Sequence, residues 1–405
     1  MSRKDKKGYV LHKGESQRAD GRYVYTYTDR YKNRRYVYAR SLAELREKER
    51  SLNRDYEDGL DPAKSKNLLV NHMVENYLEL KHDLKKTTRG SYLNVYRHYI
   101  KDNIGKCKIV GVKYSDIKKY YYSMILDHGL NGTTVDHIHC VLHPAFQMAV
   151  RDGVIRTNPT DGVMAEIKRS KYWKPYKRVA LTIPEQKELL RFLNESKEFS
   201  GWCPLITILL GTGMRIGECL GLTWSDLDFK DRMIDVNHAF NDRPDETGKT
   251  RKRIQDTKTN AGTRTIPMID EVYDAFLTEY EYQKILGFCE EEIDGYTGFV
   301  FITSQHTVIL PEAVNRAIHC IVNKHNEEET LKAKEEGRKP ILLPDFTAHV
   351  LRHTFCTRLC ENESNTLFIK EVMGHADINT TMNIYADITN EKKKEVMSGL
   401  QGKII

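Results

Sequence analysis

The sequence predicts a multidomain α+β protein. A small N-terminal three-stranded β-sheet plus one helix comes first, then an all-α domain, then a mixed, mainly helical domain with a small β-sheet. Residues 22–40 alternate with period two, which is typical of a β-hairpin. Residues 67–155 carry apolar side chains at helical spacing, and from Leu181 onward helical patterns flank short strand patterns at 232–237 and 263–268. A chain of 405 residues is long enough for two or three domains.

Two segments without periodicity divide the chain, at residues 59–66 and 168–178, and both are typical of linkers. A capping-box pattern, Ser-Leu-Ala-Glu at 41–44, opens the helix of the first module. We therefore expect a β module over residues 1–60 and a helical domain over 67–162. The mixed domain follows over 178–398, with a C-terminal tail over 399–405.

The basic charge is concentrated at the N-terminus. The net charge is +7, and the first 40 residues hold 12 Lys and Arg against 4 Asp and Glu. A basic arm on a nearly neutral body indicates a polyanionic partner, and nucleic acid is the expected one. The longest apolar run, at 204–210, is too short to cross a bilayer, and the first residues form no secretory signal. Eight scattered cysteines without a Cys-x-x-Cys pair indicate a reducing, cytoplasmic location.

The strands of the β module carry candidate DNA-contacting side chains. One interpretation lays a sheet in a DNA groove with Tyr and Arg on its outer face. The other is a sheet packed on its helix, with tyrosines as ordinary strand formers. The concentration of basic charge favours the first, with candidates Tyr23, Tyr25, Arg34, Tyr36, Tyr38 and Arg40. Lys85, Lys86 and Arg89 lie between the first two helical patterns, where cations can meet phosphates, although a solvated loop fits equally well.

Residues 211–217, Gly-Thr-Gly-Met-Arg-Ile-Gly, superficially match a dinucleotide-binding loop. The glycine spacing is one residue too long, an apolar helix precedes it, and the phosphate-loop pattern is missing, so both nucleotide interpretations are rejected. Arg215 is a lone cation among apolar neighbours, where it is costly unless it meets an anion. A buried ion pair with Glu218 explains this position, and so does a phosphate site that Glu218 orients.

Histidines, an arginine and a tyrosine gather between residues 347 and 385. In a helix over 348–360, His349 and Arg352 share one face, and His375 lies ten residues before Tyr385. Arginine binds non-bridging phosphate oxygens, imidazoles move protons, and tyrosine can be a nucleophile. A zinc site on His349 and His353 is rejected because neither zinc-helix pattern finds its glutamate here.

Together these segments resemble the catalytic signature of the tyrosine recombinases, the lambda-integrase family. The matching segments are Thr-Gly-Met-Arg-Ile-Gly-Glu, Thr-Lys-Thr-Asn-Ala-Gly-Thr-Arg, His-Val-Leu-Arg-His-Thr-Phe and Met-Gly-His…Ile-Tyr. In isolation Lys258 would be a solvated turn residue and Tyr385 a core residue. The resemblance spans the chain and is strongest to integrases of Gram-positive conjugative transposons. Gly262 departs from the small hydroxyl residue that many members carry. The implied catalytic residues are Arg215, Lys258, His349, Arg352, His375 and Tyr385, with Glu218 as an orienting residue.

The resemblance implies a site-specific DNA recombinase that integrates and excises a mobile element through a 3′-phosphotyrosine intermediate. Tyr385 would attack the phosphate, with His349 as proton acceptor and Lys258 as acid to the leaving 5′-oxygen. Because one phosphoester replaces another, the reaction needs no nucleotide energy source. The arginines, lysine and histidines supply the charge that a metal would bring, so no metal and no cofactor is expected.

The resemblance also implies partners. The β module would bind arm sites on double-stranded DNA, and the helical and catalytic domains would clamp core sites. We expect a homotetramer on DNA in the bacterial cytoplasm, with an excisionase and a host DNA-bending protein as accessory partners. The alternatives are a non-catalytic DNA-binding or architectural protein on the same fold, and a type IB topoisomerase.

Overall fold

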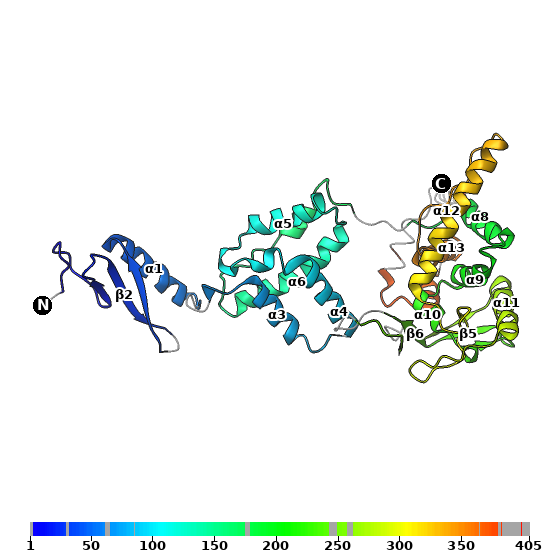
Figure 1. Cartoon of the computed structure of the whole chain (residues 1–405), viewed down its shortest axis with the longest axis horizontal. Coiled ribbons are helices and arrows are strands. Elements are labelled where there is room, and N and C mark those ends of the chain that lie inside the picture. Colours follow the sequence, from blue (N-terminus) through cyan, green and yellow to red (C-terminus); the bar gives the residue numbers. More distant parts are fainter. Residues whose placement is uncertain are drawn as a thin grey trace. The chain divides into compact units, whose positions relative to one another are not determined.

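The structure of the chain is a computed structural model that describes residues 3–29, 32–60, 65–84, 86–174, 179–242, 249–256, 262–363, 365–379, 382 and 398, the side chains of residues 86 and 87 excepted. It forms two compact units, Met1–Tyr176 with Glu246–Gly248, and Lys177–Asp245 with Lys249–Ile405. The predicted fold class is confirmed in both units (Figure 1). Within the described ranges no helix is long and apolar enough to cross a membrane.

The first unit begins with an antiparallel sheet in the order β1 (Glu15–Gln17), β2 (Tyr23–Thr28) and β3 (Arg34–Ala39). Helix α1 (Leu42–Glu57) packs on one face of this sheet, and the hydroxyl of Ser41 accepts from the backbone N–H of Glu44 at 3.1 Å. Ser41 is therefore the N-cap of this helix, as the predicted pattern requires, while the carboxylate of Glu44 accepts from the backbone N–H of Arg40 at 2.9 Å. Tyr23, Ala39 and Leu45 form the small core between sheet and helix.

The remainder of the first unit is helical. Its helices are α3 (Val70–Leu80), α4 (Lys86–Val95), a π-helical turn at Tyr96–Ile100, α5 (Tyr114–Leu126), α6 (Gly132–Arg151) and α7 (Val163–Arg169). Two short 3₁₀ turns, Ile104–Lys106 and Ile109–Gly111, connect them. Helix α6 is central, since it packs against α3, α4, α5 and α7 and buries an apolar stripe that includes Ile138, Leu142 and Phe146.

The second unit opens with three helices, α8 (Ile183–Glu195), α9 (Cys203–Thr212) and α10 (Ile216–Gly221), with a 3₁₀ turn at Ser200–Trp202. After a 3₁₀ turn at Trp224–Asp226, β4 (Leu227–Asp228), β5 (Met233–Val236) and β8 (Arg264–Pro267) form an antiparallel sheet. Strands β6 (His238–Asn241) and β7 (Arg253–Asp256) form a separate two-stranded sheet.

Four further helices of this unit lie within the described residues: α11 (Asp270–Leu286), α12 (Pro311–Glu335), α13 (Ala348–Asn362) and α14 (Thr366–Met373). Helix α9 is apolar on nearly all sides because α8, α11 and α13 pack around it. The charged stretch that begins at residue 326 continues α12 as helix (Figure 1). These packed helices bring the ends of α9, α13 and α14 together.

Candidate active site

The junction between α9 and α10 places Arg215. Helix α9 ends at Thr212, and Gly213 adopts a left-handed conformation with φ of 62°. A β-carbon at this glycine would clash with the ring of Phe355 on α13, so both the turn and the close packing require glycine. Two residues later Arg215 caps α10, and its backbone N–H donates to Glu218 Oε2 at 3.0 Å.

Helix α13 supplies Arg352, which is only 4% exposed. Its Nη1 donates to the carbonyl of Gly213 at 2.7 Å, and its Nη2 donates to the carbonyl of Met373 at 2.6 Å. Burial, followed by the nearby charge of Arg215, lowers the pKa of Arg352 to about 9. The guanidinium therefore stays protonated at neutral pH in a buried site, where the low dielectric strengthens its attraction for an anion.

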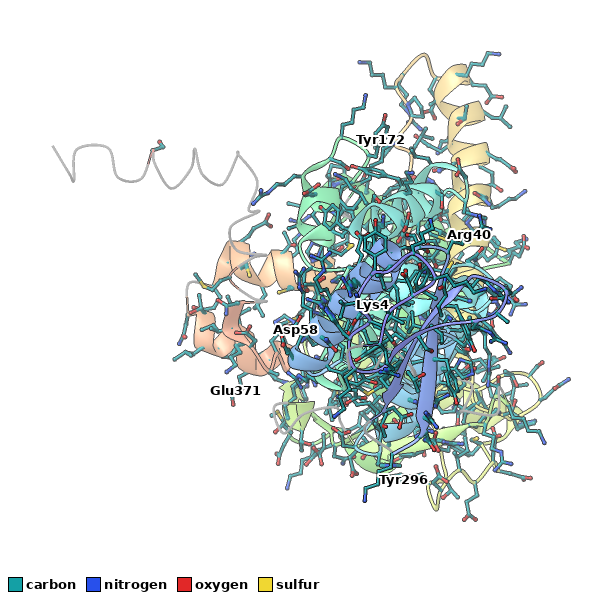
Figure 2. The ribbon with its side chains drawn as sticks, turned by 90° about the vertical axis from the view of Figure 1, so that its left-hand side faces the viewer. Lys4, Arg40, Asp58, Tyr172, Tyr296 and Glu371 are labelled. Carbon is teal, nitrogen blue, oxygen red and sulfur yellow. The ribbon has the colours of Figure 1, made fainter. Side chains whose placement is uncertain are left out.

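The C-terminal end of α14 collects three guanidinium groups. Arg264 donates to the carbonyl of Val372 at 2.7 Å, Arg352 to that of Met373 at 2.6 Å, and Arg215 to that of Gly374 at 3.0 Å. The last carbonyls of a helix lack intrahelical partners and carry its partial negative charge, so cations are favoured there. Figure 2 labels Glu371 on α14, one residue before these three carbonyls.

Glu218 forms ion pairs with two of these arginines. Arg215 Nη1 lies 2.5 Å from Oε1, and Arg264 Nη2 lies 3.0 Å from Oε2. Burial raises the pKa of this carboxyl, but Arg264 and Arg215 outweigh burial and hold it below its ordinary value. The ion pair of Arg215 with Glu218 thus exists, and it belongs to a larger cluster that carries three cations and one anion.

His375 follows Gly374 directly and is 7% exposed. Burial lowers its pKa to about 4, and the charges of Arg352 and Arg215 act in the same direction. The imidazole is therefore neutral at neutral pH and can donate one hydrogen bond without adding charge. His349 is exposed on the first turn of α13, one turn before Arg352.

Not all predicted catalytic residues can be placed. The structure brings together Arg215, Glu218, Arg352 and His375, whereas Lys258 and Tyr385 lie outside the described residues. The sequence interpretation missed Arg264, although a signal was present. In the strand pattern Arg-Thr-Ile-Pro this arginine shares its face with Ile266, and that face is the buried one.

The candidate DNA-contacting residues of the β module fall on two faces. Tyr36 and Tyr38 are 52% and 43% exposed with stacked rings, and Arg34 and Arg40 are also exposed (Arg40 is labelled in Figure 2). Tyr23 is buried against α1, where its hydroxyl donates to Asp5 at 2.6 Å, and Tyr25 packs beside the same core. The structure therefore groups Arg34, Tyr36 and Tyr38 on the outer face and gives Tyr23 and Tyr25 packing positions.

The three candidates of the helical domain are only partly described. Arg89 is half-buried on α4, Lys85 lies outside the described residues, and the side chain of Lys86 is not described.

Comparisons with known proteins agree with the fold. Residues 181–392 match the phage integrase family, and residues 1–56 match the DNA binding domain of Tn916 integrase. The transposase from transposon Tn916 of Enterococcus faecalis and the transposase from transposon Tn1545 of Streptococcus pneumoniae are each 32% identical over 416 residues. Each alignment covers 98% of this chain and 96% of the relative. A structure of the Tn1549 transposon integrase in complex with transposon right end DNA is similar with a TM-score of 0.70 and 32% identity. That match covers 83% of this chain and all of the other.

The family match, the relatives and the Tn1549 integrase structure show that this chain is a tyrosine recombinase, an enzyme that cuts and rejoins DNA at specific sites. The chain belongs to the phage integrase family, and its predicted resemblance to the integrases of Gram-positive conjugative transposons is confirmed. The predictions of a site-specific recombinase and of a DNA partner are confirmed as well.

Proposed function

We propose that this chain integrates and excises a conjugative transposon with Tyr385 as its nucleophile. The observation that carries the proposal is the convergence of Arg215, Arg352 and neutral His375 at the end of α14. Attack of the tyrosine oxygen on a DNA phosphate would form a 3′-phosphotyrosine bond and release a 5′-hydroxyl. The reverse attack by a 5′-hydroxyl of the partner strand would then restore the DNA and free the tyrosine.

The arginines would bind the non-bridging oxygens of the scissile phosphate. Arg352 is held by two carbonyls and Arg215 by Glu218 and one carbonyl, so both are ordered before DNA arrives. Preorganised charge of this kind stabilises the growing negative charge of the pentacoordinate phosphorane more than that of the ground state. His375 would add a neutral N–H donor to the same oxygens.

Proton transfer requires two further groups. A tyrosine with an ordinary pKa of about 10 is ionised to roughly one part in a thousand at pH 7, so Tyr385 needs a proton acceptor. His349, exposed and one turn from Arg352, is assigned that role. Lys258 is assigned the role of acid to the leaving 5′-oxygen, because an ammonium can supply the proton that this oxygen takes up.

The remaining parts of the chain would grip the DNA and assemble the complex. Residues 1–60 would bind arm sites through the outer face of the sheet. Residues 67–162, with Lys85, Lys86 and Arg89, and the catalytic domain over 178–398 would hold the core site. Strand exchange between two duplexes calls for four protomers, so a homotetramer is proposed, with residues 388–405 as a tail that docks on a neighbouring protomer. An excisionase and a host DNA-bending protein would bias the direction of the reaction in the bacterial cytoplasm.

A covalent-adduct assay tests the proposal. The full chain is mixed with a nicked duplex of the element end and resolved on a denaturing gel, beside Tyr385→Phe. The expected result is a protein–DNA adduct in the wild type, linked at Tyr385 by peptide mass spectrometry, and none in the variant although it still binds DNA. Binding by both without an adduct in either, over several candidate sites, would favour the non-catalytic alternative. Relaxation of any supercoiled DNA without strand exchange would favour a topoisomerase.

A further inference from the structure

We infer that Arg264 is a positioning residue for this reaction, one that fixes Arg215 through Glu218 and fixes His375 through the end of α14. The inference rests on the proposed function, because Arg264 would serve that DNA-cleavage reaction. The positions of Arg264 and its partners can nevertheless be tested without measuring catalysis. Arg264 lies on β8, six residues after Lys258 in sequence and far in sequence from every other group in the cluster.

Each side-chain nitrogen of Arg264 holds a different part of the unit. Its Nη2 donates to Glu218 Oε2 at 3.0 Å, its Nε to the carbonyl of Val372 at 2.7 Å, and its Nη1 to the carbonyl of Gly262 at 2.9 Å. The side chain is only 3% exposed. A guanidinium this enclosed, with its three nitrogens engaged by protein oxygens, acts on neighbouring residues and not on a DNA phosphate.

The link to Arg215 passes through Glu218. One carboxylate oxygen takes the Arg215 side chain, and the other takes the Arg215 backbone N–H together with Arg264. Arg264 therefore fixes the rotation of this carboxylate and balances its charge. Without Arg264 the carboxylate would be drawn wholly to Arg215, and Arg215 would turn toward Glu218 and away from an incoming phosphate.

The link to His375 passes through the last turn of α14. Arg264, Arg352 and Arg215 occupy three successive carbonyls, at Val372, Met373 and Gly374, immediately before His375. A helix end without partners for its carbonyls frays. Removal of Arg264 frees the first of these three carbonyls in a buried position, so the backbone that carries His375 becomes less ordered.

The test compares Arg264→Met, Arg264→Lys, Glu218→Gln and the double variant Arg264→Met/Glu218→Gln in the full chain. The matched control is Arg232→Met, since Arg232 forms a solvent-exposed ion pair with Asp270 close to the same sheet. In the double variant both members of the buried Arg264–Glu218 pair are replaced by neutral side chains, so it serves as the folded comparison if Arg264→Met by itself does not fold.

Hydrogen exchange measures the geometry. Amides within residues 366–376 are expected to exchange about tenfold or more faster in Arg264→Met and in the double variant, because the helix end opens locally. Exchange in α1 and in Arg232→Met is expected to match the wild type. Unchanged exchange over 366–376 in the folded variants would overturn the inference, whether or not the chain cleaves DNA.

The rate of single-turnover adduct formation at saturating DNA measures how the displaced groups affect catalysis. Arg264→Met is expected to slow adduct formation by roughly 100-fold, the cost typical of an ångström-scale misplacement of catalytic groups. DNA affinity should change by less than about threefold, since Arg264 makes no DNA contact. Arg264→Lys should recover about a tenth of the wild-type rate or more, because it keeps the charge. Adding Glu218→Gln should cause little further loss, since both residues act on Arg215.

Two outcomes of this assay would overturn the inference. One is a double variant whose loss of rate equals the product of the losses caused by Arg264→Met and by Glu218→Gln separately. The other is a loss of rate in Arg232→Met as large as that in Arg264→Met. A wild type that forms no adduct counts against the proposed function and leaves the exchange result to decide on Arg264.

Discussion

The outer face of the β module and the end of α14 both present cations and polar rings suited to DNA, but in opposite ways. Tyr36 is 52% exposed, whereas Arg352 is 4% exposed and held by two carbonyls. Exposed groups on a sheet each contribute a small, salt-dependent share of binding. Buried and mutually ordered groups act as one unit, so the loss of one disturbs the rest. If the proposed roles hold, this difference means that binding is spread over many residues of the module, while chemistry is concentrated in a few residues of the catalytic unit.

The largest effect is expected from Arg352→Ala. Loss of this buried charge removes transition-state stabilisation, so single-turnover adduct formation should fall by about 10³-fold or more. Core-DNA affinity should change far less, because many other phosphate contacts remain. Arg316→Ala, at an exposed arginine paired with Glu312, is the matched control and should keep wild-type rates. A comparable loss in both variants would break the comparison.

The next largest effect is expected from Glu218→Gln, and it concerns the stability of the catalytic unit. It leaves Arg215 and Arg264 close together without their shared carboxylate, and breaking a buried pair costs on the order of 3 kcal/mol of unfolding free energy. Urea denaturation of the free protein measures this cost. A stability within experimental error of the wild type would show that the cluster is not cooperative.

Glu279 on α11 is a buried carboxylate beside an amide, Gln283, whereas Glu218 is a buried carboxylate beside two arginines. Burial raises the pKa of Glu279 to about 7, despite a hydrogen bond with Gln283. In the unfolded chain this carboxyl has its ordinary pKa of 4.5, so folding loses stability as pH rises from there to about 7.

Glu279→Gln should therefore stabilise the protein by about 3 kcal/mol at pH 8. The gain should vanish near pH 3, where the carboxyl is protonated in both states. Denaturation of both proteins at the two pH values checks the sign. A destabilised variant at pH 8 would show that Glu279 has a cationic partner in solution.

The smallest single effects are expected in the β module. Arg34→Ala should weaken arm-duplex binding by roughly 3- to 10-fold, since one phosphate contact is lost. For the same reason it should reduce the slope of log affinity against log salt concentration by about 1.

Tyr23→Phe should leave binding unchanged and reduce the free energy of unfolding of the β module by about 1 kcal/mol, because only the buried hydrogen bond to Asp5 is removed. Fluorescence titrations at several salt concentrations would separate the two. Equal losses of affinity in both variants would contradict the assignment of faces.

The sequence predicted the fold class and the site to different depths. Periodicity located the hairpin at 22–40 and the helix over 348–360, because each pattern is local. It did not show which face of the sheet α1 covers, so Tyr23 and Tyr25 were grouped with Tyr36. Arg264 was missed because its partner at Val372 is 108 residues away. Contacts of that separation depend on packing that no local pattern records.

The division of labour between the two regions is tested most directly by two assays on the same preparations. Wild type, Tyr36→Ala/Tyr38→Ala and Arg352→Ala are each measured for arm-duplex binding and for single-turnover adduct formation on a nicked core duplex. The account predicts that the tyrosine variant loses arm binding by about tenfold or more and keeps its core cleavage rate. Arg352→Ala should lose cleavage and keep arm binding. A tyrosine variant that cleaves core DNA as slowly as Arg352→Ala would contradict the account, because binding and chemistry would then not be separable.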